Sequence, residues 1–332
     1  MRRRRDSTRR APMARPLLRR LPFRTFPSTS QNENDANKPA ETATRLNFPI
    51  PTLGGKQIWS DIFIQDNWRI QRNVYTGNCR LLDPNNIRRA SGTYDHCRSF
   101  FGQCRPESAK RDGSDHLVLL VHGLGRSAGA FTEMEDALRR AGYETESVNY
   151  PSTRQSIAAH ADNLDHIIET LDGVEKLSFV THSLGALVVR ELLSRDHTWQ
   201  EQTEPHRIVM IAPPNQGSQL ADRLKSLQAY QWITGESGQG LTSDEARKLP
   251  APDVEFGIIA GGRGNEIGFN PLLPGDDDGL VTVAETQLDG ARDFLLVPTT
   301  HGLVDDHPQT IDATVTFLRD GRFTPEIVAV AT

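Results

Sequence analysis

Six short stretches of strand character, most of them apolar and β-branched, recur through the last two thirds of this 332-residue chain, separated by helical patterns or long loops. They span residues 117–121, 145–148, 177–181, 208–212, 256–260 and 294–297. Runs of this kind predict buried strands. Between the second and third runs, apolar residues step by four, three, four and three positions from Ile157 to Leu171, which is typical of a helix packed on a sheet. Regular alternation of strands and helices predicts a mostly parallel sheet with helices on both faces, whose ligands bind at the carboxyl ends of the strands.

The first 114 residues follow different patterns. Residues 1–45 are polar and Arg-rich, with scattered Pro, Ser and Asn, and predict a disordered basic tail. Short alternating stretches between 54 and 83, with a turn at Gln65, Asp66 and Asn67, predict an antiparallel hairpin. Residues 85–114 show no clear period, so we expect irregular structure there. The predicted organisation is a tail over 1–45, an extension with a hairpin over 46–114, and an α/β domain over 115–325.

The junction after the third predicted strand places a serine where a nucleophile can act. Ser183 falls between the strand and an apolar helix-forming run that starts at Gly185. In such an elbow, a strained backbone exposes Oγ and directs the next backbone N–H towards the reacting group. The segment T-H-S-L-G departs from the usual G-x-S-x-G at Thr181. Taken alone, it also fits an ordinary strand–helix unit with a serine at the helix N-cap.

Two further segments that follow strands supply partners for this serine. V-H-G-L-G-R-S, residues 121–127, lets the backbone turn sharply with exposed N–H groups. The N–H groups of Leu124 and Leu184 are therefore the predicted pair of donors for an oxyanion. His301 follows the last strand, at the sheet edge where a general base is required. An isolated glycine turn or histidine is usually structural, and only their positions favour a functional interpretation.

Three consecutive carboxylates, Asp276, Asp277 and Asp278, lie between the last two strands. A relay to an imidazole needs one buried carboxylate. Asp278 is the predicted one because the chain returns to apolar character directly after it, whereas Asp276 and Asp277 are predicted to be solvated. A bound cation such as Ca²⁺ is the alternative explanation for such a loop.

Charge along the chain is unevenly distributed. The formal net charge is −5, yet residues 1–30 contain ten Arg and one acidic residue, Asp6, a local +9 that leaves −14 for the remainder. An acidic body is a poor candidate for nucleic-acid binding. The Arg-rich start resembles a transit peptide or a solvated basic tail and lacks the apolar core of a secretory signal. No run approaches the roughly 18 apolar residues of a membrane span, so we expect a cytoplasmic protein without a transmembrane segment.

The cysteine content is low. Cys79, Cys97 and Cys104 form no C-x-x-C pair, which argues against a zinc site or a disulfide framework. Free thiols are favoured, with one disulfide among the three as the alternative.

Five short motifs, taken in order, resemble the α/β-hydrolase lipases and esterases, especially small bacterial lipases and related deacylases. They are V-H-G-L-G, T-H-S-L-G-A, A-P-P-N-Q-G-S, D-G-L-V and T-H-G-L, within about residues 115–320. The order serine, aspartate, histidine is also that of α/β-hydrolases. The residue two before the serine varies among small residues in this family, so Thr181 is compatible with it. The roles that the resemblance implies are nucleophile, base, orienting acid and two backbone donors, carried by Ser183, His301, Asp278, Leu124 and Leu184 respectively.

The resemblance implies a serine hydrolase that cleaves small-molecule or lipid esters through an acyl-enzyme, without metal or cofactor. The same residues could serve an acyltransferase, a thioesterase or an amidase. A non-catalytic binding protein can also use this fold. The sequence by itself does not separate these alternatives.

The segment 217–274 is longer than one crossover needs, which predicts a cap on the catalytic domain. Leu220, Leu224 and Leu227 are spaced as one apolar helix stripe. Aromatic and aliphatic residues extend it, namely Tyr230, Trp232 and Ile233. If the stripe lines an acyl pocket, esters of medium to long chains should be preferred. The alternative is that it packs on the sheet as the crossover helix.

Overall fold

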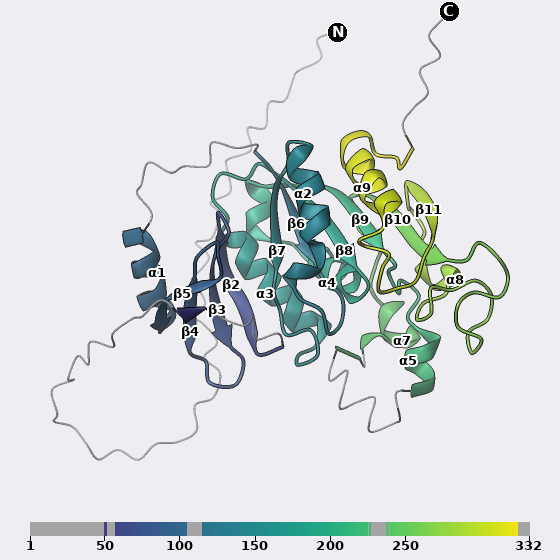
Figure 1. Cartoon of the computed structure of the whole chain (residues 1–332), viewed down its shortest axis with the longest axis horizontal. Helices are drawn as coiled ribbons and strands as arrows, with labels where there is room; N and C mark the ends of the chain where they lie inside the picture. Colours follow the sequence, from purple (N-terminus) through teal and green to yellow (C-terminus); the bar gives the residue numbers. More distant parts are fainter. Residues whose placement is uncertain are drawn as a thin grey trace, which may run out of the picture. The chain divides into compact units, whose positions relative to one another are not determined.

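The computed structural model describes residues 50–51, 57–104, 115–224, 226, 237–238 and 240–324 of the chain (Figure 1). These residues belong to one unit that covers Leu46–Thr332. The predicted disordered tail over residues 1–45 lies outside the described residues. So do residues 225, 227–236 and 239 of the predicted cap, which include Leu227, Tyr230, Trp232 and Ile233.

Six parallel strands form the main sheet, in the order β11-β10-β9-β8-β6-β7. The strands are β6 (His116–Val121), β7 (Glu144–Val148), β8 (Lys176–His182), β9 (Glu204–Ile211), β10 (Glu255–Gly262) and β11 (Asp293–Pro298). All six predicted strands are confirmed. The chain runs outward from β6 to β7 and then returns to β8 on the other side of β6, so the strand order reverses between β6 and β8. Such a reversal opens a crevice at the carboxyl ends of the strands, where ligands bind in sheets of this type.

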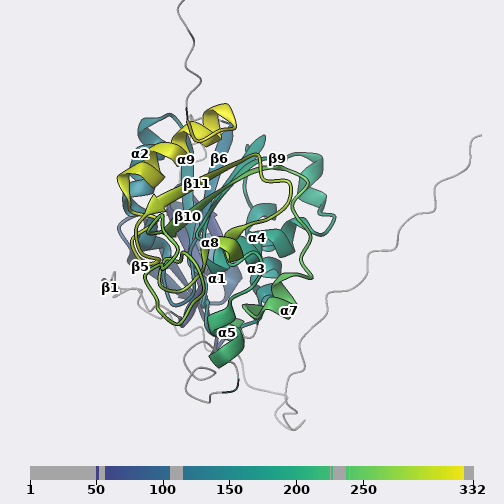
Figure 2. The ribbon, with the colours of Figure 1, turned by 90° about the vertical axis from the view of Figure 1, so that its right-hand side faces the viewer.

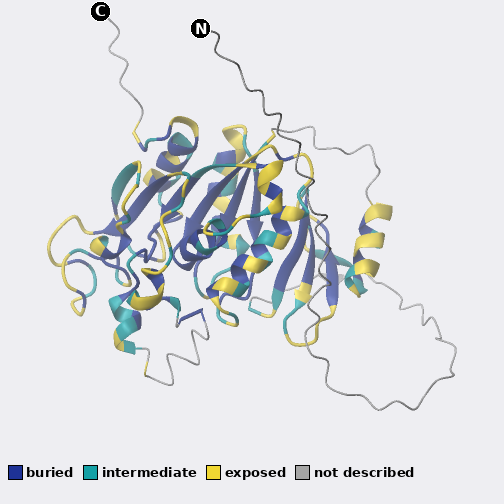
Figure 3. Cartoon of the chain, turned by 180° about the vertical axis from the view of Figure 1, so that it is seen from behind, coloured by how far each residue is buried: buried dark blue, intermediate teal, exposed yellow. Residues whose placement is uncertain are grey.

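Helices cover both faces of this sheet, as Figure 2 shows. One face packs against α2 (Thr132–Arg140) and α9 (Pro308–Asp320), and the other against α3 (Ile157–Glu169) and α4 (Leu184–Leu193). Successive side chains of β6 alternate between these two cores, as the two-residue period of a strand requires. The apolar parts of β6, β8, β9 and β10 are therefore buried on both faces (Figure 3), which explains why these strands contain continuous apolar runs. The edge strand β11 is mostly half-buried, and β7 is buried although it is largely polar.

The amphipathic stripe that begins at Ile157 forms α3, as predicted. Ser156 caps the helix, since its side chain accepts a hydrogen bond from the backbone N–H of Ala159 at 3.2 Å. The stripe residues pack into the same core as α4.

An antiparallel sheet with strand order β1-β5-β4-β3-β2 precedes the main sheet. Its strands are β1 (Ile50–Pro51), β2 (Trp59–Gln65), β3 (Trp68–Asn73), β4 (Cys79–Leu82) and β5 (Ile87–Gly92). The predicted hairpin corresponds to β2 and β3, which pair in an antiparallel register around a turn at Asp66 and Asn67.

The expectation of irregular structure over 85–114 is wrong for its first part. Residues 87–92 form β5, and α1 (Tyr94–Cys104) packs against β4 and β5. Both elements bury few side chains, Ala90 in β5 and Cys97 and Phe101 in α1, so neither shows a strong apolar period. Cys79, Cys97 and Cys104 are free thiols, as favoured from the sequence.

In the described part of the segment between β9 and β10 lie the short helices α5 (Gln219–Leu224) and α7 (Ser243–Ala246). Further short helices among the described residues are η1 (Ala128–Phe131), η2 (Thr198–Glu201) and α8 (Val283–Thr286). Within the described ranges, no helix has the length and apolar character needed to span a membrane.

Candidate active site

Ser183 lies on a sharp turn between β8 and α4. Its backbone adopts φ 53° and ψ −120°, a left-handed conformation that is costly for a residue with a β-carbon. The chain holds it there because the Ser183 N–H donates to the carbonyl of Ile211 in β9 at 2.9 Å. The strained turn agrees with the predicted elbow and leaves the serine side chain at the carboxyl end of the sheet.

The close approach of α4 to β6 explains the glycine of this motif. A β-carbon at Gly185 would lie 2.2 Å from the carbonyl oxygen of Val121, so a side chain cannot be accommodated. Thr181, where the motif departs from glycine, is fully buried and donates from Oγ1 to the carbonyl of Val209 at 3.3 Å. At that position the fold has room for a threonine and a partner for its hydroxyl.

Ser183, His301 and Asp278 form a continuous hydrogen-bonded chain. His301 Nε2 lies 3.0 Å from Ser183 Oγ, and His301 Nδ1 lies 2.7 Å from Asp278 Oδ2. The His301 backbone N–H also donates to the Asp278 carbonyl at 2.9 Å, so the two loops are joined twice. Because the carboxylate accepts from Nδ1–H, the Nε2 lone pair faces the serine hydroxyl.

The other oxygen of Asp278 is held independently of His301. Oδ1 accepts the backbone N–H groups of Leu280 at 3.0 Å and Val281 at 2.8 Å. Asp278 is 1% exposed, so these donors and the imidazole, in place of water, stabilise its charge. The carboxylate therefore has one fixed orientation.

The prediction that Asp276 and Asp277 are both solvated is wrong for Asp277. This residue is fully buried, and Oδ1 accepts the N–H groups of Asn270 at 2.9 Å and Gly279 at 2.7 Å. Asp276 is half-buried and its two oxygens accept the N–H groups of Arg263 and Gly264. The three carboxylates thus face different partners. In the part of the chain that the structure describes, no group of three His, Cys, Asp or Glu side chains is placed to hold a metal ion.

The two predicted oxyanion donors come from different elements, the loop after β6 and the start of α4. Leu184 is the first residue of α4, and the N–H groups of the first helical turn have no partner within the helix. Leu124 lies in the loop after β6 and lines the same cavity as Ser183. Among the described residues, neither N–H is hydrogen-bonded to a protein acceptor. Both amides therefore remain able to bind a ligand oxygen.

His182, next to the serine, was not singled out from the sequence. Its Nε2 lies 3.0 Å from the backbone carbonyl of His301, and the two rings are 4.9 Å apart. Burial, reinforced by the neighbouring His301, lowers the pKa of His182 well below its usual value. His182 is therefore neutral, with its Nε2–H donating to the loop that carries His301. In the sequence, its position directly before Ser183 in the T-H-S-L-G motif was the signal that could have identified it.

Arg126 and Asp305 form a second pair that the sequence did not indicate. Arg126 Nη2 lies 3.0 Å from Asp305 Oδ2, and Nη1 donates to the Gly302 carbonyl at 3.3 Å. Burial raises the pKa of Asp305 to about 6, and the Arg126 charge opposes this shift. The pair connects the loop after β6 to the loop that follows His301.

A cavity of about 380 Å³ opens in front of Ser183 and His301. This volume lies within the usual range for small-molecule sites. Its walls are mainly apolar and are formed by Leu124, Pro214, Leu220, Ala221, Leu241, Leu280 and Val281. The cavity can therefore hold an apolar group next to the serine hydroxyl.

Residues 83–237 match a family described as a domain of unknown function, DUF7379. Among solved structures, the chain is similar to the lipase BlEst2 of Bacillus licheniformis in its propeptide form, at 20% identity and a TM-score of 0.51, over 60% of this chain and 49% of that one. Similarity to the mature form of that lipase reaches 19% identity and a TM-score of 0.49, over 61% and 90% of the two chains. A metagenomic carboxyl esterase, MGS0156, gives 21% identity and a TM-score of 0.47, over 59% and 68%.

At these identities the likeness concerns the fold. The six-stranded parallel sheet with helices on both faces confirms the predicted α/β-hydrolase fold and the resemblance to that superfamily. This chain spans about half the length of the propeptide-form lipase that it matches.

Proposed function

We propose that the protein is a serine hydrolase that cleaves carboxylic esters, with Ser183 as nucleophile, His301 as general base and Asp278 as orienting acid. The observation that carries the proposal is the chain of hydrogen bonds from Asp278 through His301 to a serine held at positive φ. This arrangement supplies the base that a serine hydroxyl needs to become nucleophilic at neutral pH.

The proposed reaction has two acyl-transfer steps. His301 Nε2 takes the hydroxyl proton while Ser183 Oγ bonds to the ester carbonyl carbon, and the N–H groups of Leu124 and Leu184 stabilise the oxyanion. Nε2–H then protonates the leaving alcohol as the ester C–O bond breaks, which leaves an acyl-enzyme. Water repeats the cycle, releases the acid and restores the serine. Asp278 stabilises the imidazolium formed in each step.

A fluorophosphonate probe tests this assignment without knowledge of the natural substrate. Such probes phosphonylate serines activated by a neighbouring base. We expect stoichiometric labelling of Ser183, located by mass spectrometry of the digested protein. Labelling at another serine, or none at all in the folded protein, would contradict the proposal.

Acyltransferase, thioesterase and amidase activities use the same groups with another acceptor or acyl bond. Product analysis of ester turnover with and without an added alcohol or amine separates transfer from hydrolysis. Thioester and amide substrates of the same acyl group test the other two activities. We place ester hydrolysis first because the structural neighbours above are lipases and esterases.

The apolar cavity leads us to expect a preference for medium to long acyl chains, with the segment around α5 acting as a cap. Leu220 and Leu241 come from this segment and line the cavity. Each buried CH₂ contributes about 0.8 kcal/mol, so kcat/KM should rise from acetate towards longer p-nitrophenyl esters. Leu220→Ala should lower kcat/KM for the preferred chain roughly 10-fold, because about 1.5 kcal/mol of apolar contact is lost, and should leave acetate nearly unchanged.

Leu272→Ala is the matched control, since Leu272 is exposed and does not line the cavity. A maximum at acetate that Leu220→Ala does not change would mean that the segment is structural and that the protein is a small-ester esterase.

A further inference from the structure

The loop after β6 that carries Leu124 contains little regular structure of its own. Leu124 stands between Gly123 and Gly125, and Gly125 has φ 72°. Glycines on both sides leave the direction of the Leu124 N–H weakly determined by local sterics. An oxyanion donor must nevertheless be preorganised, because reorientation during the reaction forfeits much of its effect.

Three backbone groups that follow Leu124 are held by side chains from outside the loop. The Gly125 N–H donates to Ser152 Oγ at 2.9 Å, and the Ala128 N–H donates to Asn149 Oδ1 at 2.9 Å. Between them, the Arg126 carbonyl accepts from Gln57 Nε2 at 3.2 Å. The loop is thus fixed at three points within four residues.

Gln57 lies at the centre of this arrangement and belongs to the extension that precedes the main sheet. Its Nε2 also donates to Ser152 Oγ at 3.1 Å, so it contacts both the loop and the hydroxyl that holds Gly125. Its Oε1 accepts the N–H and the hydroxyl of Thr153, each at 2.9 Å. Both ends of the amide are therefore occupied, which fixes its orientation.

The third fixed group of the loop, the Ala128 N–H, is also connected to the antiparallel sheet. Asn149, which holds Ala128, exchanges two hydrogen bonds with Asp61 of β2. The Asp61 N–H donates to the Asn149 carbonyl at 2.8 Å, and the Asn149 N–H donates to Asp61 Oδ2 at 2.6 Å. The antiparallel sheet thus reaches the loop by two routes.

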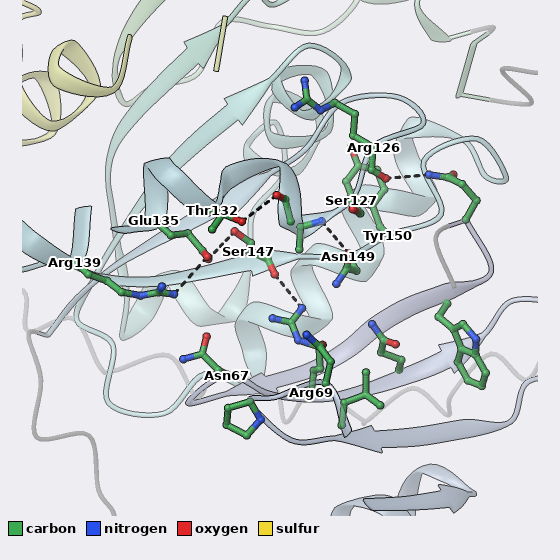
Figure 4. A pocket seen from close by; sticks show the side chains of 18 residues that line it. Asn67, Arg69, Arg126, Ser127, Thr132, Glu135, Arg139, Ser147, Asn149 and Tyr150 are labelled. Carbon is green, nitrogen blue, oxygen red and sulfur yellow. Dashed lines mark hydrogen bonds and ion pairs between the residues drawn. The ribbon is translucent and has the colours of Figure 1, made fainter. Parts of the chain in front are cut away.

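A polar cavity of about 510 Å³ lies between these two parts of the protein (Figure 4). In Figure 4, Arg126, Ser127 and Thr132 lie on one side of the cavity, and Asn67 and Arg69 lie on the other. The cavity separates much of the antiparallel sheet from the loop after β6. The hydrogen bonds of Gln57, at the edge of the cavity, are therefore a main connection between the sheet and the loop.

We propose that Gln57 is a positioning residue through which the N-terminal antiparallel sheet holds the Leu124 N–H in the orientation that an oxyanion requires. The inference rests on the proposed hydrolase function. It assigns a role to a part of the chain that lies outside the motifs of the α/β region. Gln57 itself touches no reacting atom and acts through Arg126, Ser152 and Gly125.

Gln57→Glu is the sharpest test, because Glu is nearly isosteric and keeps the acceptor for Thr153 but loses both N–H donors. We expect kcat to fall roughly 10- to 100-fold, less than complete loss of a donor, with KM within about twofold. The inhibition constant of a trifluoromethyl ketone, whose adduct carries an oxyanion, should rise by the same factor as kcat/KM falls. The pH profile of kcat should keep its acidic limb, since His301 is untouched.

Ser152→Ala provides a second variant that acts on the same connection. It should lower kcat by a similar factor. The double variant should lower kcat by less than the product of the two single factors, because both changes interrupt the same connection from Gln57 to the loop. Arg72→Gln, an exposed change in β3, is the control and should behave as wild type. Melting temperatures exclude simple unfolding as the cause.

Hydrogen exchange of residues 122–128 gives a readout that does not depend on activity. Faster exchange in Gln57→Glu than in wild type is expected even if the natural reaction is another one. Wild-type kcat, ketone affinity and exchange in both variants would overturn the proposal. A wild-type protein that neither turns over esters nor reacts with the fluorophosphonate would instead contradict the proposed function, and exchange alone would then decide whether Gln57 orders the loop.

Discussion

Ser183→Ala is expected to lower kcat for ester hydrolysis by about 10⁴ or more while the protein stays folded, because members of such a triad act as a unit. The variant removes the hydroxyl that lies 3.0 Å from His301 Nε2. It leaves the backbone hydrogen bond from residue 183 to Ile211 in place. The measurement is kcat on a p-nitrophenyl ester, with the melting temperature as the check on folding.

Ser194→Ala, at the carboxyl end of α4, is the matched control and should keep full activity. If Ser183→Ala retains more than about a hundredth of the wild-type rate, its activity is far above the residual activity expected after loss of the nucleophile. The nucleophile is then another group.

Asp278→Asn is expected to cost about 10⁴ in kcat, by analogy with the loss of the triad aspartate in serine proteases. The structure gives a specific reason. The N–H groups of Leu280 and Val281 keep the amide oxygen on their side, so the amide NH₂ faces His301 Nδ1. His301 then has to accept at Nδ1 and carry its proton on Nε2, which leaves the serine hydroxyl without a base.

The two neighbouring carboxylates are the controls for this variant. Asp276→Asn should stay within a few-fold of wild type, since Asp276 only accepts from backbone N–H groups of Arg263 and Gly264. Asp277→Asn should lower the free energy of unfolding by about 1–3 kcal/mol, because the N–H groups of Asn270 and Gly279 hold the amide oxygen and leave the NH₂ at the buried Oδ2 position, which has no hydrogen-bond partner among the described residues. If Asp276→Asn or Asp277→Asn loses more kcat than Asp278→Asn, then Asp278 is not the residue that orients His301.

The main sheet could be predicted from the sequence because its four inner strands, β6, β8, β9 and β10, are buried on both faces over their apolar parts. Continuous apolar runs over 117–121 or 177–181 leave few alternatives to a buried strand. The antiparallel sheet could be predicted only in part from the sequence. β5 is I-R-R-A-S-G and buries Ala90 alone, so its position depends on pairing with β1 and β4 and not on its own pattern.

The candidate site was predicted from the order of motifs after the strands, and the structure brings His301 within hydrogen-bond distance of both Ser183 and Asp278. Which of three identical carboxylates faces the imidazole was inferred from the apolar residues that follow. The burial of Asp277 was missed, because D-D-D carries no local signal that separates a buried carboxylate from a solvated one.

By itself, the sequence determined the parallel sheet, its helices and the residues at the strand ends, because hydrophobic periodicity and turn chemistry act over a few neighbouring residues. Only the tertiary structure decided which distant groups hold those residues in place. Gln57 meets Arg126 across 69 residues, and His182 meets the His301 carbonyl across 119. Such contacts involve ordinary polar residues with no local pattern. They arise only when the packing of the sheets brings a donor and an acceptor within about 3 Å.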